Sequence, residues 1–201
     1  MQRKKILFLT QCFPYPPDGD GARRICYNFL YHLGKRYDIT LLSYATAEEM
    51  TYIEKLRPYC SRIITVLPPG QGLLRKALSL FCPLPSNVSM WFKREMVRTL
   101  HELTTAEDFD LIYADMLSMS LFIRGLPFAK IASPHDAFSL LYRRRVAFLR
   151  GITRLLYLWE GQKLRRYERR ILPLMDGCCV VSDVDREYFA GELGIPGVFT
   201  A

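Results

Sequence analysis

The sequence predicts an α/β fold in which helices flank both faces of a parallel sheet. Short apolar runs recur along the 201 residues, and segments with helical periodicity separate them. The runs are apolar nearly throughout rather than alternating with polar residues, which is typical of strands buried on both faces. Strands that alternate with helices in this way form parallel, doubly wound sheets.

Six short segments are predicted to be strands: residues 6–10, 39–43, 63–67, 111–114, 129–132 and 178–182. Helical periodicity predicts helices at residues 22–33, 47–56, 90–103, 146–172 and 183–193. Lys163 interrupts the apolar face of the fourth helix, and Gly194 is expected to end the fifth. Residues 83–86 read as a loop between helices, and residues 194–201 have the pattern of an approach to another strand.

The composition is that of a globular domain, with 50% hydrophobic and 24% charged residues. It excludes disordered and low-complexity proteins. The longest apolar runs, such as residues 6–9 and 178–181, are far shorter than the roughly 18–20 residues of a membrane span. The basic start of the chain precedes an apolar run too short for a signal peptide, so we expect a cytoplasmic protein.

Metal binding and disulfide formation are both disfavoured by the cysteine pattern. None of the six cysteines forms a C-x-x-C pair, and the three histidines are scattered, so no metal site is expected. Cys178 and Cys179 are adjacent in a predicted strand, where neighbouring side chains point to opposite faces. We therefore expect buried, reduced thiols.

Ligands of parallel α/β sheets bind at the carboxyl ends of the strands, so the loop after the first strand is a candidate site. It contains Gly19 and Gly21, which allow close approach or a positive φ, and Arg23 and Arg24 follow. The helix after it suits a phosphate, but a tight turn with Asp20 capping that helix is an equally good interpretation. Arginine at position 24 departs from G-x-G-x-x-G and disfavours a standard dinucleotide site.

His135 and Asp136 follow the fifth predicted strand and form a second candidate site. A histidine at this position can hydrogen-bond a sugar hydroxyl or a phosphate, with Asp136 orienting its ring or capping the next helix. The alternative is a pair that only shapes the loop. Asp115, after the fourth strand, is expected to cap a helix, and Ser182 with Asp185 matches a helix N-cap.

Residues 143–170 are strongly basic, with ten arginines and lysines against Glu160 and Glu168. The favoured interpretation is a solvated helix face whose aromatic residues lie in the core. An anionic membrane surface comes second and nucleic acid third, because no nucleic-acid-binding motif accompanies the net charge of +8. Residues 73–81 place apolar side chains around two cations and also suit a membrane surface.

Residues 5–25 resemble the opening of family 4 glycosyltransferases, and in particular bacterial sugar transferases of polysaccharide and exosortase-associated clusters. The shared pattern is a strand, a Pro-Tyr-Pro-Pro loop, a glycine-containing turn and an arginine. Residues 133–136, 142–145 and 164–170 also fit this family in order and spacing. The resemblance therefore extends over essentially the whole chain.

The resemblance implies the GT-B arrangement, in which two Rossmann-like domains face each other across a cleft. Residues 1–201 would be the amino-terminal, acceptor-side domain, with the carboxyl-terminal donor domain absent. Because two such domains need about 350–400 residues, we expect the chain alone to be inactive and a separate donor-domain chain to be a candidate partner. The implied transfer is retaining and needs no metal or cofactor beyond the nucleotide-sugar co-substrate.

The resemblance also implies roles for single residues. His135 would help to hold the donor sugar, with Asp136 beside it, and Gly19 and Gly21 would line the cleft near the donor phosphates or the acceptor. Arg23 and Arg24 would supply charge for a phosphate. The expected acceptor is a saccharide or a lipid-linked sugar in cell-surface polysaccharide assembly, at the inner membrane face. The alternative is a non-catalytic Rossmann-type module that binds a nucleotide or a phosphate.

Overall fold

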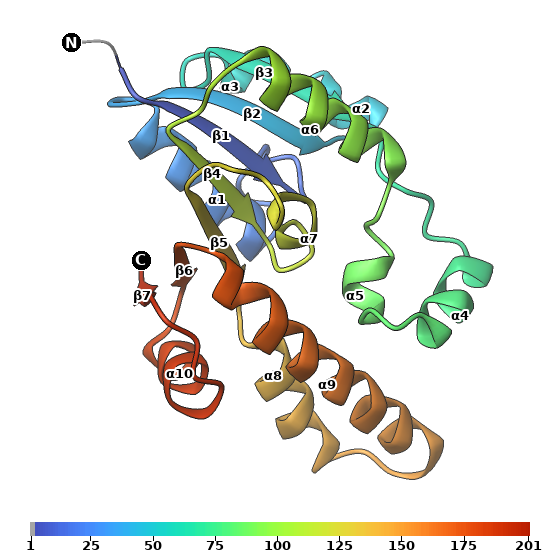
Figure 1. The fold of residues 1–201 in the computed structure, drawn as a ribbon. Helices are drawn as coiled ribbons and strands as arrows, with labels where there is room; N and C mark the ends of the chain where they lie inside the picture. Colours follow the sequence, from blue (N-terminus) through green and yellow to red (C-terminus); the bar gives the residue numbers. More distant parts are fainter. Residues whose placement is uncertain (1–2) are drawn as a thin grey trace.

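The computed structural model describes residues 3–201, which contain a parallel seven-stranded sheet in the order β3-β2-β1-β4-β5-β6-β7 (Figure 1). The strands are β1 (Lys5–Thr10), β2 (Asp38–Tyr44), β3 (Arg62–Val66), β4 (Leu111–Asp115), β5 (Lys130–His135), β6 (Gly177–Val180) and β7 (Val198–Thr200). The chain winds outward from β1 to β3 and then in the other direction from β4 to β7. The predicted doubly wound, Rossmann-like α/β class is confirmed.

All six predicted strands are present, and the expected further strand is β7. The main difference is at the end of β5, which extends three residues beyond the predicted boundary to His135. The sequence Ser133-Pro134 reads as a loop, but β5 keeps pairing with β6 after a register shift, and His135 aligns with Val180. His135 is therefore the last residue of a strand rather than part of a flexible loop.

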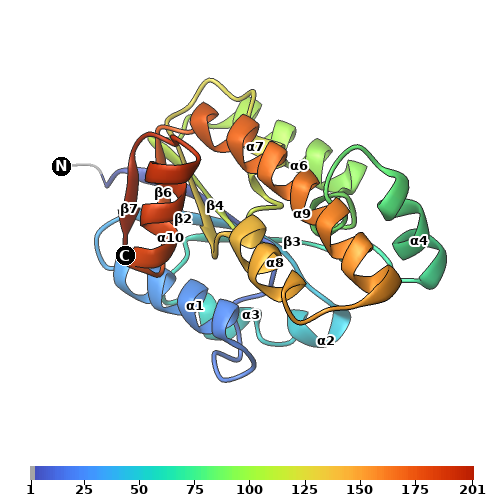
Figure 2. The same ribbon diagram turned by 90° about the horizontal axis from the view of Figure 1, so that it is seen from below.

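Helices cover both faces of the sheet (Figure 2). One side carries α1 (Gly21–Leu33), α2 (Ala47–Met50) and α3 (Ile53–Leu56), and the other carries α6 (Arg94–Ala106), α7 (Ser120–Ile123) and α9 (Gly151–Ile171). The remaining helical elements are α4 (Leu73–Phe81), α5 (Ser86–Ser89), α8 (Phe138–Val146), α10 (Asp183–Glu187), a 3₁₀ turn (Leu172–Leu174) and a π-helical turn (Tyr188–Glu192).

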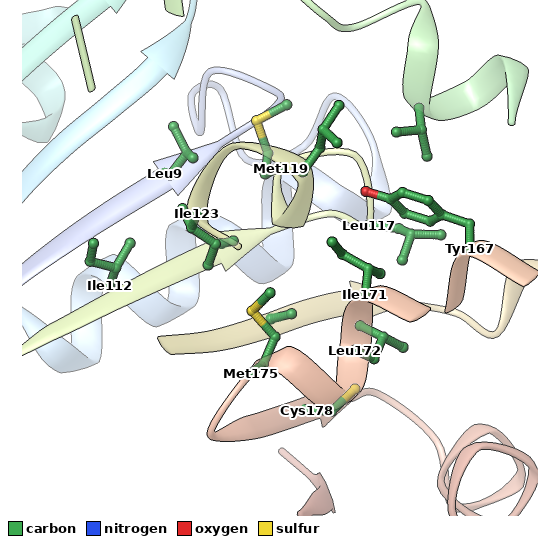
Figure 3. Close-up of a cluster of buried hydrophobic side chains, with 14 of the residues drawn as sticks. Leu9, Ile112, Leu117, Met119, Ile123, Tyr167, Ile171, Leu172, Met175 and Cys178 are labelled. Carbon is green, nitrogen blue, oxygen red and sulfur yellow. The ribbon is translucent and has the colours of Figure 1, made fainter. Parts of the chain in front are cut away.

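The continuous apolar strands are explained by this double cover. In β1, Ile6 and Phe8 pack into the cluster under α1 and α3, whereas Leu7 and Leu9 pack into the cluster under α6, α7 and α9. Figure 3 shows Leu9 in this second cluster, together with Ile123 of α7 and Ile171 of α9. Each fully buried leucine or phenylalanine contributes about 1.5–3 kcal/mol, so both faces stabilise the same strand.

Two predicted helices have different bounds in the structure. Residues 47–56 form two short helices, α2 and α3, and the hydroxyl of Thr51 between them donates to the Glu48 carbonyl. The helix predicted at residues 146–172 is α9, which begins five residues later, at Gly151, while Val146 is the last residue of α8. The aromatic residues of this basic segment are also not all in the core: Tyr167 is buried, but Phe148 and Trp159 are exposed.

Lys163 interrupts the apolar face of α9, as its sequence indicates, and the helix passes through it without a break. Lys163 is buried against Glu160, with 2.5 Å between Nζ and Oε1, and its Nζ also donates to the carbonyl of Leu80 at 3.2 Å. The other carboxylate oxygen of Glu160 accepts a hydrogen bond from the backbone N–H of Ser86 at 2.7 Å. This pair therefore fixes the end of α4 and the start of α5 to α9.

The substitution Lys163→Met should leave Glu160 as an unpaired buried charge. It should lower the free energy of unfolding by about 3–5 kcal/mol. Urea denaturation measures this change. The matched control, Arg98→Met, breaks an exposed pair with Glu102 and should cost less than about 1 kcal/mol. Equal costs for the two variants would contradict the anchoring role of the buried pair.

Candidate functional site

Three polar side chains meet where β1, β4 and β5 end. Thr10, Asp115 and His135 are the last residues of these neighbouring strands. Asp115 Oδ1 lies 2.8 Å from His135 Nε2, and the hydroxyl of Thr10 donates to Asp115 Oδ2 at 3.0 Å. The three residues are at most 4% exposed. They form one hydrogen-bonded chain at the carboxyl edge, where ligands of such sheets bind.

The backbone at this edge is strained. His135 has φ +66° and Met116, directly after Asp115, has φ +77°. A residue other than glycine in the left-handed region costs about 1–3 kcal/mol, and such residues cluster at functional sites. The two strained residues lie at the ends of adjacent strands, beside the hydrogen bond between His135 and Asp115.

The electrostatics of His135 follow from its partner. Burial lowers the pKa of His135, but the hydrogen bond and the charge of Asp115, helped by the charges of Asp136 and Asp20, outweigh burial and raise the pKa above its ordinary value of 6.5. Because Nε2 faces Asp115, a neutral ring carries its proton on Nε2 and keeps Nδ1 as an acceptor. Within residues 3–201, Nδ1 has no hydrogen bond, so it is the nitrogen available to a ligand.

The predicted roles of the two aspartates need correction. Asp136 is exposed and forms no hydrogen bond with the imidazole, because Asp115 occupies that place. Asp115 is not a helix cap, because α7 begins only at Ser120 and the N-cap position is Met119. Burial and the charge of Asp185 raise the pKa of Asp136, and the charge of His135 opposes them. Asp115 is therefore the carboxylate that contacts His135, whereas the sequence analysis expected it to cap a helix.

The start of α8, three residues after His135, is capped by carboxylates from other elements. Glu168 of α9 accepts hydrogen bonds from the backbone N–H of Ser139 at 3.0 Å and from its hydroxyl, and Asp185 of α10 accepts from the N–H of Ala137 at 3.0 Å. The predicted cap of α10 is present, since Ser182 accepts from the N–H of Asp185. Burial raises the pKa of Glu168 to about 7, although the bonds from Ser139 oppose the shift.

A carboxyl group whose pKa is higher in the folded than in the unfolded state makes the folded protein less stable as pH rises between the two pKa values. For Glu168 the pKa rises from its ordinary value of 4.5 to about 7. Between these pH values the free energy of unfolding should fall by about 3 kcal/mol. Glu168→Gln should remove this fall, as measured by urea denaturation across this pH range. Glu187→Gln, an exposed control on α10, should leave the profile unchanged. Parallel profiles for wild type and Glu168→Gln would contradict the assignment.

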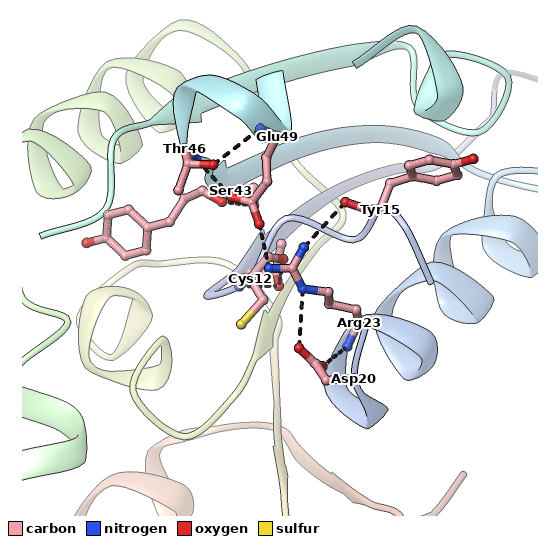
Figure 4. A network of polar contacts seen from close by, with 9 residues as sticks. Cys12, Tyr15, Asp20, Arg23, Ser43, Thr46 and Glu49 are labelled. Atoms are coloured by element: carbon pink, nitrogen blue, oxygen red, sulfur yellow. Dashed lines mark hydrogen bonds and ion pairs between the residues drawn. The ribbon is translucent and has the colours of Figure 1, made fainter. Parts of the chain in front are cut away.

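The loop after β1 is held by the side chain of Arg23 (Figure 4). Asp20 caps α1 by accepting from the N–H of Arg23 at 2.8 Å, which confirms the capping interpretation. The guanidinium of Arg23 pairs with Glu49 at 2.5 Å and with Asp20 at 3.2 Å. Its charge is thus compensated within the protein. Arg24 is exposed and has no ion pair within residues 3–201, so it is the available cation of the two.

Neither glycine of this loop has a positive φ. A side chain at Gly21 would meet nothing within 4 Å, and one at Gly19 would lie 3.2 Å from Cδ of Arg23. Gly21 therefore leaves open space at the start of α1. The sequence analysis missed the neighbouring contact in which the Ser118 hydroxyl donates to Gln11 Oε1, which joins the loops after β1 and β4.

All six cysteines are free thiols, as predicted, but the predicted burial is confirmed only for four of them, since Cys12 and Cys82 are half-buried. Burial raises the pKa of Cys12, the cysteine in the β1 loop, to about 11, so this thiol stays protonated and is a poor nucleophile. Residues 3–201 contain no group of three or more metal-ligating side chains. In the same part of the chain, no helix is long and apolar enough to cross a membrane.

Replacing Asp115→Asn tests the electrostatic link with His135. In the wild type, the stabilisation from charged His135 is complete below pH 6.5 and is lost as pH rises through the raised folded-state pKa. Without the carboxylate, this loss should disappear and the protein should be less stable below pH 6.5. Urea denaturation at several pH values measures both effects. His101→Gln, an exposed control on α6, should keep the wild-type profile, and a wild-type profile in Asp115→Asn would contradict the link.

No protein-family model and no curated protein matches the chain. Two solved structures resemble it. UDP-glucose: anthocyanidin 3-O-glucosyltransferase, solved with UDP, aligns with a TM-score of 0.51 and 13% identity over 100% of this chain and 53% of the enzyme. TcCGT1, also solved with UDP, aligns with a TM-score of 0.52 and 11% identity over 99% of this chain and 50% of its own. The chain spans about half the length of either, and the likeness shows that it shares their Rossmann-like α/β fold.

Proposed function

We propose that the chain is the acceptor-side domain of a glycosyltransferase that uses a nucleotide-sugar donor. The observation that carries the proposal is the buried chain of Thr10, Asp115 and His135 at the carboxyl edge of the sheet. The two structural neighbours were both solved with UDP, which supports a nucleoside diphosphate as part of the donor. The resemblance to family 4 glycosyltransferases supports the same reaction class.

The roles of the site residues follow from their positions. When the His135 ring is charged, Nδ1–H donates to a sugar hydroxyl or a phosphate oxygen, and Asp115 stabilises the positive charge. Gly21 leaves room for a ligand at the amino end of α1, beside the Asp20 carboxylate that caps this helix. Arg24 adds a cation there, and Asp136 lies beside His135 as an exposed carboxylate.

A second domain completes this proposal. A single Rossmann-like domain offers one wall of a cleft, and the donor would be held between this edge and a donor-binding domain, as in the GT-B arrangement. The transfer proposed is retaining and independent of a metal. The acceptor proposed is a saccharide or lipid-linked sugar in cell-surface polysaccharide assembly, with the protein in the cytoplasm at the inner membrane face. On this proposal, residues 1–201 alone bind ligands but do not turn over.

The second candidate function is a non-catalytic module that binds a nucleotide or a phosphate. The exposed Arg24 beside the open space at Gly21 supports it, because a cation next to free space can bind a phosphate without any catalytic group. The two functions differ in affinity. An acceptor-side domain makes only part of the donor contacts and binds UDP weakly, whereas a self-sufficient module binds it tightly.

Calorimetric titration of the chain with UDP and GDP separates these functions. The glycosyltransferase proposal predicts weak binding, with a Kd of about 1 mM, that is lost in His135→Ala and retained in the control His101→Ala. Micromolar binding that His135→Ala abolishes would favour the self-sufficient module. Binding that survives His135→Ala would contradict the site, and sugar transfer by the chain alone would contradict the need for a second domain.

A further inference from the structure

The outward face of α4 is apolar. Leu73, Leu74, Leu78 and Phe81 are 84%, 74%, 61% and 87% exposed, and the only buried side chain of this nine-residue helix is Ser79. A helix at a protein surface normally buries its apolar side chains and exposes its polar ones. This helix has the reverse arrangement, so its apolar face is available to a partner.

The amino-terminal half of α9 carries a second exposed apolar stripe. Ile152, Leu155 and Trp159 are 70%, 61% and 56% exposed, and their spacing of three and four residues places them on one helix face. Phe148, in the turn between α8 and α9, is also exposed. Both α4 and this turn follow the carboxyl ends of strands, β3 and β5 respectively, so they project beyond the edge that carries His135 (Figure 1).

The two stripes form one surface, because α4 and α9 are fixed to each other. Lys163 of α9 donates to the carbonyl of Leu80 in α4, and Glu160 accepts from the N–H of Ser86 at the start of α5. Figure 2 shows α4 beside the amino-terminal half of α9. We call this surface, made of the exposed apolar residues of α4 and α9, the apolar platform.

A cavity of about 890 Å³ adjoins the apolar platform, and Phe81 and Trp159 belong both to its lining and to the platform. The other lining residues include three arginines, Arg124, Arg166 and Arg170. Arg166 and Arg170 continue the helix face of Trp159. Within residues 3–201, none of these three arginines has an ion-pair partner, so the cavity presents uncompensated positive charge beside an apolar surface.

We propose that the apolar platform docks on an anionic phospholipid bilayer, and that the arginine-lined cavity receives a phosphate headgroup. Exposed apolar side chains flanked by cations are the pattern of proteins that lie in the membrane interface. The apolar side chains enter the headgroup–acyl boundary, and the arginines bind lipid phosphate by charge-assisted hydrogen bonds. The inference deepens the lipid-linked acceptor of the proposed function and rests on it for its biological role. The docking itself requires no nucleotide sugar.

Vesicle co-sedimentation tests the docking. The chain should bind vesicles of phosphatidylcholine with phosphatidylglycerol and bind pure phosphatidylcholine much more weakly. Arg166→Gln/Arg170→Gln should weaken binding to the anionic vesicles at least about tenfold, because each arginine near the surface contributes about 1 kcal/mol. The matched control, Arg36→Gln/Arg62→Gln, removes two exposed cations at the amino-terminal edge of the sheet and should bind as the wild type does.

The apolar contribution needs a variant of its own. Leu74→Ser/Phe81→Ser should reduce vesicle binding strongly, whereas Val97→Ser, an exposed apolar control on α6, should not. The chain has two tryptophans, and Trp159 lies on the platform. Brominated lipid should therefore quench tryptophan fluorescence in the wild type, and this quenching should be lost in Trp159→Phe.

Absence of binding to anionic vesicles would overturn the proposal, as would equal binding of the wild type and Leu74→Ser/Phe81→Ser. A dimer seen by light scattering and abolished in that variant would assign the platform to a second copy instead. Circular dichroism confirms that each variant is folded. Unchanged UDP binding in the platform variants distinguishes failure of docking from failure of the proposed function.

Discussion

The buried hydrogen bond between Asp115 and His135 is the contact on which the candidate site depends. A carboxylate that is 1% exposed is strongly destabilised unless it is paired, and here a ring nitrogen at 2.8 Å and the hydroxyl of Thr10 at 3.0 Å provide its partners. The parallel register places the partners together, because β1, β4 and β5 are neighbours and end at the same edge. His135 has a left-handed backbone, and its Nδ1 makes no hydrogen bond within residues 3–201.

The same principle of a buried polar anchor recurs away from this edge. Glu168 fixes the start of α8, which directly follows the candidate site, and the Glu160–Lys163 pair fixes α4 and α5 to α9. The long helix α9 supplies all three of these charged side chains. It therefore connects the helix that follows His135 with the exposed apolar surface.

The sheet could be predicted from sequence because its strands are apolar on both faces. Strands such as β1 and β2 can therefore be recognised as continuous apolar runs from local composition alone. The partner of His135 could not, because Asp115 lies 20 residues away and becomes a neighbour only through the order of β4 and β5. The end of β5 was missed because Ser133-Pro134 has the composition of a loop. The pairing of Lys163 could have been predicted from sequence, since Glu160 lies three residues before it on the same helix face. The exposure of Trp159 and Phe81 depends on tertiary packing and has no local signature.

The most direct test of this account is nitrogen NMR of the imidazole of His135 as a function of pH. The signal can be assigned by comparison with His32→Gln and His101→Gln, since the chain has three histidines. The account predicts a proton on Nε2 in the neutral ring, an unprotonated Nδ1 whose shift changes when UDP is added, and a pKa above 6.5. A neutral ring protonated on Nδ1, or a pKa below 6.5, would show that Asp115 does not hold the ring and would contradict the proposed site.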